Sequence, residues 1–251
     1  MSGDAPRRRV VVITGAGGAL GAAVARRLAG EPATDLVLSD ISEPSLQATL
    51  DGLPAGDATV EVVLADVGDG NHVQRVVDRT IERFGHLDVF VSNAGVLAPN
   101  GRIHNLTTED WDRVIRINLM GAVNGIRTAV PVMRTQRSGS IILTASVAGM
   151  TAWSHAAPYC ATKAAVIQLA KVAAVEYAGD GIRVNCVCPG TFRSAIHDDL
   201  PPEALDVIAG RHPLGLGGAD DLVGAYSYLA GDDSRWTTGA ALVVDGGYSA
   251  P

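Results

Sequence analysis

Residues Val10–Leu28 read VVVITGAGGALGAAVARRL and follow directly on three arginines, Arg7, Arg8 and Arg9. A basic triplet before an uncharged run that ends in Ala-Val-Ala is typical of a secretory signal. The same stretch also fits a buried strand, a glycine turn and the start of an amphipathic helix, an arrangement that holds phosphate groups. The remainder of the chain decides between these interpretations.

The remainder alternates short apolar stretches with longer segments of helical period. Strands are expected at 10–14, 35–39, 59–65, 87–92, 140–146, 183–188 and 241–245, and helices at 18–30, 43–52, 71–85, 108–134, 158–177 and 203–209. Such repetition, with strands that are apolar almost throughout, predicts a parallel sheet covered on both faces. The fold class is therefore α/β: a single-domain, doubly wound Rossmann fold over residues 1–251, with about seven parallel strands. Cleavage of a signal would remove the first strand, which argues against export.

The composition excludes several classes of protein. The chain has 251 residues and a formal net charge of −7, so a nucleic-acid partner, which needs clustered Lys and Arg, is not expected. Beyond the opening stretch, no uncharged apolar run approaches the ~20 residues of a membrane-spanning helix. Cys160, Cys186 and Cys188 lie in apolar surroundings without metal-ligand spacing, which predicts reduced thiols, no metal site and a cytoplasmic location.

The turn after the first expected strand has the composition of a dinucleotide site. It contains Gly15, Gly17, Gly18 and Gly21. The G-x-G-x-x-G pattern is incomplete, because Leu20 occupies its last glycine place. Asp40, which ends the second strand, lies at the distance where a carboxylate accepts the hydroxyls of a ribose. Taken alone, Asp40 is equally well a helix cap or a turn residue.

The residues around Asp40 favour NAD over NADP. Ile41 and Ser42 follow it where an arginine would hold a 2′-phosphate, and Gly18 stands in the turn where a basic residue would do the same.

Tyr159 and Lys163 are spaced so that both side chains project from one face of the same helix. A phenol has a pKa of about 10, but a neighbouring ammonium and a positive nicotinamide ring both favour the phenolate, so a lowered pKa is expected. Ser146 ends the strand at 140–146, at the edge of the sheet where such folds bind ligands. Its hydroxyl is expected beside that of Tyr159, although a capping role is also possible for a serine here.

Motifs along nearly the whole chain resemble the short-chain dehydrogenase/reductase family. They are TGAGGALG (14–21), Asp40, ADV (65–67), SNAG (92–95), Asn118, Ser146, YCATK (159–163), RVNCVCPGTF (183–192) and VVDGG (243–247). No single motif is decisive, but their order and spacing together are highly specific.

The resemblance implies a role for each matching residue. Tyr159 would be the general acid/base, Ser146 would orient the substrate oxygen, Lys163 would bind the nicotinamide ribose and lower the Tyr159 pKa, and Asn118 would hold a water linking Lys163 to solvent. The implied cofactor-binding residues are Gly15, Gly18, Leu20, Gly21, Asp40, Ile41, Asp66, Val67, Asn93, Ala94, Gly95, Tyr159, Lys163, Pro189, Gly190, Phe192 and Ser194.

Two positions depart from the family pattern. Ala19 replaces the middle glycine of the turn, and would weaken cofactor binding by about 1 kcal/mol or more if the turn required a positive φ there. Ser92 replaces a frequent asparagine but leaves Asn93 in place, which is a minor change.

Residues 191–214 interrupt the strand–helix rhythm and are expected to form a substrate lid. The expected substrate pocket comprises Val96, Trp153, Phe192 and Ile196. Because these side chains are apolar, a small or medium, mostly uncharged secondary alcohol or its ketone is the expected substrate, with NAD as cofactor.

Two other functions remain open from the sequence. One is an NADPH-dependent reductase of 3-oxoacyl thioesters, against which Asp40 and the net acidity argue. The other is a dinucleotide-binding sensor without turnover, which the fold allows and the set Asn118, Ser146, Tyr159 and Lys163 opposes. The resemblance also implies a homotetramer that pairs the helices following Asn118 and beginning at Pro158.

Overall fold

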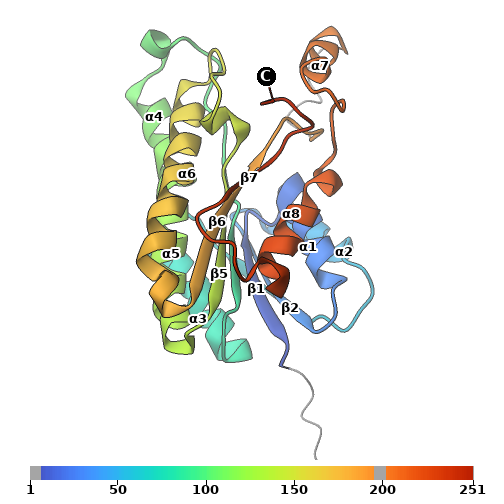
Figure 1. Cartoon of the computed structure of the whole chain (residues 1–251), viewed down its shortest axis with the longest axis vertical. Coiled ribbons are helices and arrows are strands. Elements are labelled where there is room, and N and C mark those ends of the chain that lie inside the picture. Colours follow the sequence, from blue (N-terminus) through green and yellow to red (C-terminus); the bar gives the residue numbers. More distant parts are fainter. Residues whose placement is uncertain (1–6, 195–201, 251) are drawn as a thin grey trace, which may run out of the picture.

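The expected strands form one parallel sheet in the computed structural model, which describes residues 7–194 and 202–250 (Figure 1). The strands are β1 (Arg9–Thr14), β2 (Thr34–Asp40), β3 (Val60–Leu64), β4 (Val89–Ser92), β5 (Gly139–Thr144), β6 (Ile182–Pro189) and β7 (Ala241–Val244). They pair in the order β3-β2-β1-β4-β5-β6-β7, and every pairing is parallel. The predicted fold class is therefore confirmed.

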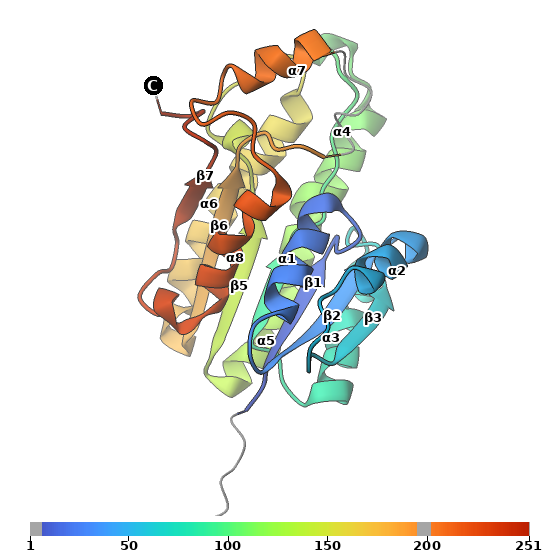
Figure 2. The same cartoon turned by 90° about the vertical axis from the view of Figure 1, so that its right-hand side faces the viewer.

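Helices cover both faces of the sheet (Figures 1 and 2). One face carries α3 (Gly70–Phe84), α5 (Met120–Gln136) and α6 (Ala157–Tyr177), and the other carries α1 (Ala19–Ala29), α2 (Glu43–Asp51) and α8 (Val223–Ala230). The remaining α-helices described are α4 (Thr108–Val114), which leads into α5, and α7 (Pro202–Ala209), beyond the carboxyl ends of the strands. Within the described ranges, no helix combines the length and apolar character needed to cross a membrane.

The apolar run of β1 is explained by burial on both sides. Val11 and Ile13 pack into the cluster beneath α1 and α8, whereas Val12 packs into the cluster beneath α3 and α5. Successive side chains of a strand point to opposite faces, so a strand covered on both faces has no polar positions. Because β1 lies between β2 and β4, the opening stretch Val10–Leu28 supplies an interior strand of the sheet.

The strand order reverses direction at β1, and this reversal positions the site. The chain moves outward from β1 through β2 to β3, then returns to lay β4 on the other side of β1 and continues to β7. The connections leaving β1 and β4 therefore diverge to opposite faces of the sheet. A crevice forms between them at the carboxyl ends, which is where open parallel sheets bind ligands.

Two elements differ from the prediction. The helix expected at 108–134 is divided by a wider π turn at Ile115–Leu119, which separates α4 from α5. A helix at Val223–Ala230 was not predicted at all, because its short apolar run lacks a clear helical period. Its Tyr226 and Leu229 are fully buried, so α8 completes the second layer of the fold.

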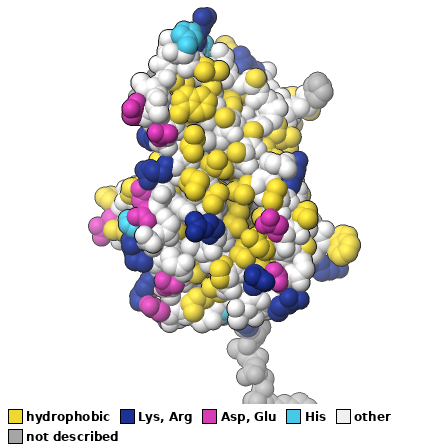
Figure 3. All heavy atoms as spheres, turned by 90° about the vertical axis from the view of Figure 1, so that its left-hand side faces the viewer, with side chains coloured by type: hydrophobic (Ala, Val, Ile, Leu, Met, Phe, Trp, Pro, Cys, Tyr) yellow, Lys and Arg dark blue, Asp and Glu magenta, His cyan; other side chains and the backbone are white. Residues whose placement is uncertain are grey.

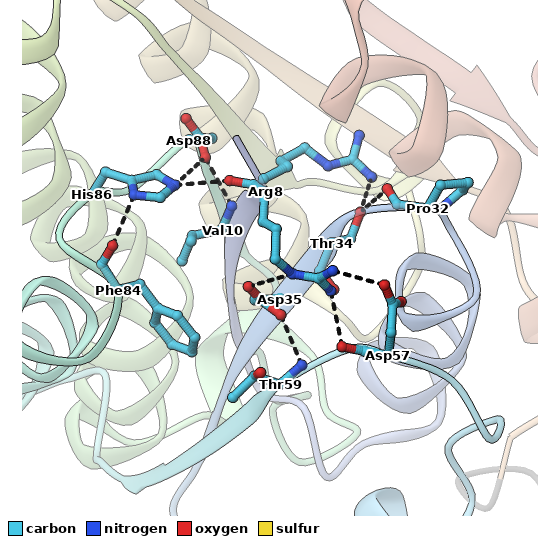
Figure 4. A network of polar contacts seen from close by, with 11 residues as sticks. Arg8, Val10, Pro32, Thr34, Asp35, Asp57, Thr59, Phe84, His86 and Asp88 are labelled. Atoms are coloured by element: carbon cyan, nitrogen blue, oxygen red, sulfur yellow. Dashed lines mark hydrogen bonds and ion pairs between the residues drawn. The ribbon is translucent and has the colours of Figure 1, made fainter. Parts of the chain in front are cut away.

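A polar network holds the amino ends of the strands (Figure 4). The Arg8 guanidinium donates to Asp35 Oδ2 at 2.9 Å and to Asp57 Oδ2 at 2.8 Å, while Asp35 Oδ1 accepts the Thr59 N–H. Asp88 accepts the backbone N–H of Val10. These contacts join the residues preceding β1 to the loops before β3 and β4, at the edge of the sheet opposite the crevice.

Candidate active site

A cavity of about 600 Å³ lies at the carboxyl ends of the strands. The predicted site residues that line it are Gly15, Gly18, Leu20, Gly21, Asp40, Ile41, Asp66, Val67, Asn93, Ala94, Gly95, Val96, Ser146, Trp153, Tyr159, Lys163, Pro189, Gly190, Phe192 and Ser194. Asn118 is not part of the lining, and Ile196 lies outside the described residues. Lining residues that were not predicted as part of the site include Leu97, Arg116, Ile117, Thr144 and Thr191.

The turn after β1 is shaped to receive a phosphate group. Gly15 has φ = +66°, and a Cβ there would lie 2.6 Å from the Ala94 Cα, so this position requires glycine. Gly18 is the N-cap of α1 and offers no side-chain acceptor. The first N–H groups of α1 therefore have no side-chain acceptor from the N-cap residue. Their partial positive charge is available to an anion in the cavity.

Ala19 fits this turn without strain. It is the first residue of α1, and the described non-glycine residues with positive φ are Ala33, Arg137 and His155. The condition under which Ala19 was expected to weaken cofactor binding is therefore not met.

Asp40 combines a turn role with a place in the cavity wall. Its Oδ2 accepts the Gly17 N–H at 2.9 Å and its Oδ1 accepts the Ser42 N–H at 3.1 Å. The helix cap itself is Ser42, whose hydroxyl accepts the Ser45 N–H at the start of α2. The two backbone hydrogen bonds fix the carboxylate at the cavity edge, so the turn role and the predicted ribose contact are compatible.

Asp66 is paired with a residue that the sequence did not identify. Its Oδ2 lies 2.7 Å from the Arg116 guanidinium, and its Oδ1 accepts the Gly68 N–H. Partial burial raises the pKa of Asp66, but Arg116 and the Gly68 N–H together outweigh burial and hold that pKa below its ordinary value. Arg116 was missed because a single arginine in a helical segment normally indicates a solvated face.

The loop after β4 is built around Asn93. Its Nδ2 donates to the carbonyl oxygens of Thr14 and Gly15 at 3.2 and 3.1 Å, which ties the end of β1 to the end of β4. Ala94 packs against Gly15, and a Cβ on Gly95 would lie 3.4 Å from both Asn118 Oδ1 and Lys163 Nζ. Asn93 thus shapes the wall of the cavity through backbone contacts.

Ser146, Tyr159 and Lys163 lie together at the inner end of the cavity. The Ser146 side chain lies near enough to the Tyr159 hydroxyl to favour its phenolate, and its Oγ accepts the Ala148 N–H. Lys163, one helical turn after Tyr159 on α6, has its Nζ 5.6 Å from the centre of the Tyr159 ring. Its Nζ donates to the carbonyl oxygen of Thr144 at 2.7 Å, a contact the sequence did not indicate.

Burial controls the ionisation of both groups on α6. It raises the pKa of Tyr159 above its ordinary value, and the nearby Ser146 hydroxyl opposes this only in part. Burial also lowers the pKa of Lys163 to about 8. In the chain alone, desolvation therefore outweighs the lowering of the Tyr159 pKa that was expected from Lys163, whose ammonium lies over the ring and donates to Thr144. The lowering expected with the nicotinamide ring in place remains a prediction.

Asn118 lies in the π turn between α4 and α5 and is 3 % exposed. Its Oδ1 accepts the Val96 N–H at 2.8 Å, and its Nδ2 donates to the Val96 carbonyl oxygen at 2.9 Å. The side chain therefore holds the loop that carries Val96 in the cavity wall. The predicted water between Asn118 and Lys163 remains a prediction.

Several large apolar side chains line the cavity. Trp153 lies against Tyr159, with ring centres 6.2 Å apart and planes inclined by 24°. Val96 and Leu97 come from the loop after β4, and Phe192 from the segment after β6. Of the predicted lid, residues 191–194 and 202–214 are described; Thr191, Phe192 and Ser194 line the cavity.

Comparison with known proteins identifies the family. A family model described as enoyl-(acyl carrier protein) reductase matches residues 15–249. The chain is 37% identical, over 99% of both sequences, to cis-4-hydroxycyclohexanecarboxylate dehydrogenase of Sinomonas cyclohexanicum. It is 35% identical, over 95% of this chain and 97% of the relative, to 3-oxoacyl-[acyl-carrier-protein] reductase of Thermotoga maritima. The crystal structure of a short-chain dehydrogenase/reductase from Burkholderia xenovorans superimposes with a TM-score of 0.92 at 33% identity, covering 98% of both chains.

The chain belongs to the short-chain dehydrogenase/reductase family. It is an oxidoreductase that interconverts alcohols and ketones with a nicotinamide dinucleotide.

The cavity of this short-chain dehydrogenase/reductase fits a dinucleotide. Two glycines leave no room for a side chain beside the turn. A Cβ at Gly15 would meet Ala94, and a Cβ at Gly21 would overlap the Gly15 carbonyl oxygen. The uncapped N-terminus of α1 suits a pyrophosphate, and the Asp40 carboxylate suits a ribose. Among the described residues, no cluster of three or more His, Cys, Asp or Glu side chains is arranged to hold a metal ion.

Proposed function

We propose that this chain is an NAD(H)-dependent dehydrogenase of a small, mostly uncharged secondary alcohol. The observation that carries the proposal is that Ser146, Tyr159 and Lys163 line one cavity together with the glycine turn and Asp40. Two hydroxyl groups at one end and a phosphate cradle at the other support the reversible oxidation of an alcohol whose oxygen lies between Ser146 and Tyr159.

Each side chain has a distinct task in this proposal. When bound, the nicotinamide ring accepts or donates the hydride. The Ser146 hydroxyl holds the substrate oxygen, and the Tyr159 oxygen removes its proton during oxidation or returns it during reduction. Lys163 lies behind the Tyr159 ring and supplies the positive charge that stabilises the phenolate as the proton moves. Asn118 keeps the adjoining loop in place through its two hydrogen bonds with Val96.

Other residues of the cavity are proposed to bind the two ends of the dinucleotide. Asp66 and Val67 contact the adenine, and the stretch Asn93–Gly95 passes beside the dinucleotide. The nicotinamide carboxamide is held by Pro189, Gly190, Phe192 and Ser194, which line the cavity after β6.

NAD is the proposed cofactor because Asp40 is fixed at the cavity edge. Hydrogen bonds from Gly17 and Ser42 hold its carboxylate where it can accept from both hydroxyls of the adenosine ribose. A 2′-phosphate at that place would meet a negative charge at short range. With NAD as cofactor, the proposed physiological direction is oxidation of the alcohol.

Asp40→Asn is expected to lower kcat/KM with NAD⁺ about tenfold or more and to reduce the preference for NAD⁺ over NADP⁺ by a similar factor. The substitution removes a charged hydrogen-bond acceptor, which contributes about 1.5–3 kcal/mol, together with the repulsion of a 2′-phosphate. Initial rates with both cofactors measure the effect. Glu43→Gln, an equal charge change at an exposed position of α2, serves as control and should leave both values unchanged. A tenfold preference of the wild type for NADPH would overturn the NAD assignment.

The proposed substrate class follows from the apolar end of the cavity. Trp153, Phe192 and Leu97 offer dispersion contacts and shape, without a charge to neutralise. Because a curated relative acts on a hydroxycyclohexane carboxylate, a ring alcohol is the first choice. The test is a panel of cyclohexanol, 1-phenylethanol, a 3-hydroxysteroid and sorbitol, followed by NADH absorbance. No NADH from any member would contradict the proposal.

Reduction of a 3-oxoacyl thioester is the second candidate, favoured by the Thermotoga maritima relative. The two candidates differ in cofactor and in charge. A reductase of carrier-protein thioesters is expected to use NADPH and to present a basic docking surface, whereas this chain carries a net charge of −7. Oxidation of NADPH by acetoacetyl thioester, faster than any NAD⁺-linked oxidation in the panel, would support the second candidate.

A homotetramer in the cytoplasm completes the proposal. Figure 3 shows apolar side chains gathered over the face that α4, α5 and α6 form in Figure 1. On this face Val175 is 83 % exposed, and Val172 and Met120 are also exposed. Burial of such a patch against a second copy would stabilise the assembly. The free Cys160, Cys186 and Cys188 support a reducing compartment.

Val175→Glu is expected to shift the assembly from tetramer to smaller species, because it introduces a charge at the most exposed of these apolar side chains, on α6. Light scattering coupled to size exclusion measures the mass. Val62→Glu, the same change on the edge strand β3, is the control and should leave the mass unaltered. A Val175→Glu protein that stays tetrameric would show that α6 does not form the interface.

A further inference from the structure

His212 occupies a buried position next to the cavity and is 4 % exposed. Its Nδ1 lies 2.8 Å from the Ile208 carbonyl oxygen, and its Nε2 accepts the Thr191 N–H at 3.2 Å. A ring nitrogen that accepts carries no proton, so these partners assign the proton to Nδ1. Both nitrogens of the neutral ring are therefore satisfied by backbone groups.

These two hydrogen bonds join segments that are separate in the sequence. Thr191 follows Gly190 at the end of β6 and lines the cavity together with Phe192 and Ser194. Ile208 belongs to the last turn of α7. The His212 imidazole thus fastens the residues that line the cavity after β6 to the end of α7.

The same imidazole contacts the C-terminal segment. Its ring centre lies 4.9 Å from that of Tyr248. The segment around Tyr248 is held by Asp245, whose carboxylate accepts the N–H groups of Gly247 and Ser249. A further hydrogen bond runs from the Leu214 N–H to the Gly246 carbonyl oxygen. These hydrogen bonds fix the backbone on both sides of Tyr248 and so hold its ring in position.

Tyr248 in turn supports Trp153. Their ring centres are 6.2 Å apart with planes at 79°, an edge-to-face contact, and the Trp153 ring also lies next to that of Tyr159. The Trp153 Nε1 is buried and has no hydrogen-bond partner among the described residues. Because no hydrogen bond within the described part of the chain orients the indole, we expect its position to depend on ring packing with Tyr248 and Tyr159.

We propose that His212 is a positioning residue for the substrate. It fixes the segment after β6 through Thr191 and, through Tyr248, holds Trp153 beside the Tyr159 hydroxyl. The inference rests on the proposed dehydrogenase function and deepens it by assigning substrate affinity to a residue that lies behind the cavity wall. His212 acts on alcohol binding, whereas proton transfer stays with Tyr159.

Two substitutions separate this role from simple packing. His212→Leu removes the acceptor for the Thr191 N–H, so KM for the fastest alcohol of the panel should rise about tenfold while kcat changes less than twofold. His212→Gln places an amide oxygen near the Nε2 position, where it can accept the same N–H, and should restore KM to within about threefold of the wild type. Urea unfolding of both variants establishes that each is folded.

A spectroscopic measurement tests the aromatic contacts without turnover. In a Trp111→Phe, Trp236→Phe background, Trp153 is the only tryptophan of the chain. His212→Leu should shift its emission to longer wavelength, because Tyr248 loses its ring partner and the indole becomes more exposed. Tyr248→Leu should give the same shift in emission, because it removes the same ring contact.

The outcomes are distinct. A wild type that oxidises an alcohol of the panel, with KM equal in the wild type and His212→Leu, would overturn this inference and leave the dehydrogenase function intact. Equal losses in His212→Leu and His212→Gln would also overturn it, since the acceptor would then be irrelevant. A wild type that oxidises none of the alcohols overturns the proposed function and this inference with it.

Discussion

Tyr159→Phe lowers the turnover of a secondary alcohol about a thousandfold and leaves NADH binding within about twofold of the wild type. The substitution removes the phenol oxygen that lies near Ser146 and leaves the glycine turn and Asp40 untouched. Loss of a positioned general acid/base removes about 10²–10⁴ of the rate. Steady-state kinetics and fluorescence titration with NADH measure the two quantities.

Tyr177→Phe is the matched control for this experiment, because it makes the same change at the far end of the same helix. It should retain full turnover. A Tyr159→Phe protein with wild-type activity would exclude the phenol as the acid/base. A wild type that binds NADH but oxidises no alcohol, with no response to Tyr159→Phe, would instead favour a sensor.

Lys163→Met has opposite effects on activity and stability. It lowers kcat about a hundredfold or more, since the phenolate of Tyr159 loses its neighbouring ammonium. At pH 7 it is also expected to raise the free energy of unfolding by about 1–2 kcal/mol. The wild type buries an ammonium whose pKa falls from 10.5 to about 8, a penalty of about 3 kcal/mol. The hydrogen bond to Thr144, worth about 1 kcal/mol, offsets part of it.

The pH dependence gives this prediction its signature. Between pH 8 and pH 10.5 the unfolded chain keeps a proton on Lys163 that the folded chain has released. The wild type therefore becomes more stable as pH rises through this window, and the advantage of Lys163→Met disappears at its upper end. Urea unfolding at pH 7 and near pH 10 measures the difference. Lys171→Met, at the exposed second lysine of the chain, should show neither effect, and an unchanged advantage at both pH values would exclude burial of the charge as its cause.

The sequence was informative wherever function requires a particular residue beside the end of a strand. Gly15, Asp40 and Ser146 each follow or end an apolar run, so the parallel sheet alone predicts that they meet at one edge. The same reasoning made the order of the family motifs meaningful. The sequence alone could therefore predict that the strands exist and that these residues lie in one cavity.

Contacts between helices and loops could not be predicted in this way. Arg116, which meets Asp66, lies in the π turn between α4 and α5, and a π turn has no clear sequence signal. The ionisation of Tyr159 was misjudged for a related reason: the sequence shows the neighbouring Lys163 but not the extent of burial of either group. The conformation of Ala19 likewise became clear only once α1 was seen to begin there.

The two ends of the described chain lie at different distances from the cavity. Arg7 and Arg8 lie at the sheet edge opposite the cavity. Asp88 holds Arg7, whereas Asp35 and Asp57 hold Arg8 (Figure 4). The last described residues instead run past His212 and Trp153. A purification tag or surface tether attached ahead of Arg7 is therefore expected to leave the cavity open. A fusion appended after Ser249 is expected to disturb Tyr248 and its contact with Trp153.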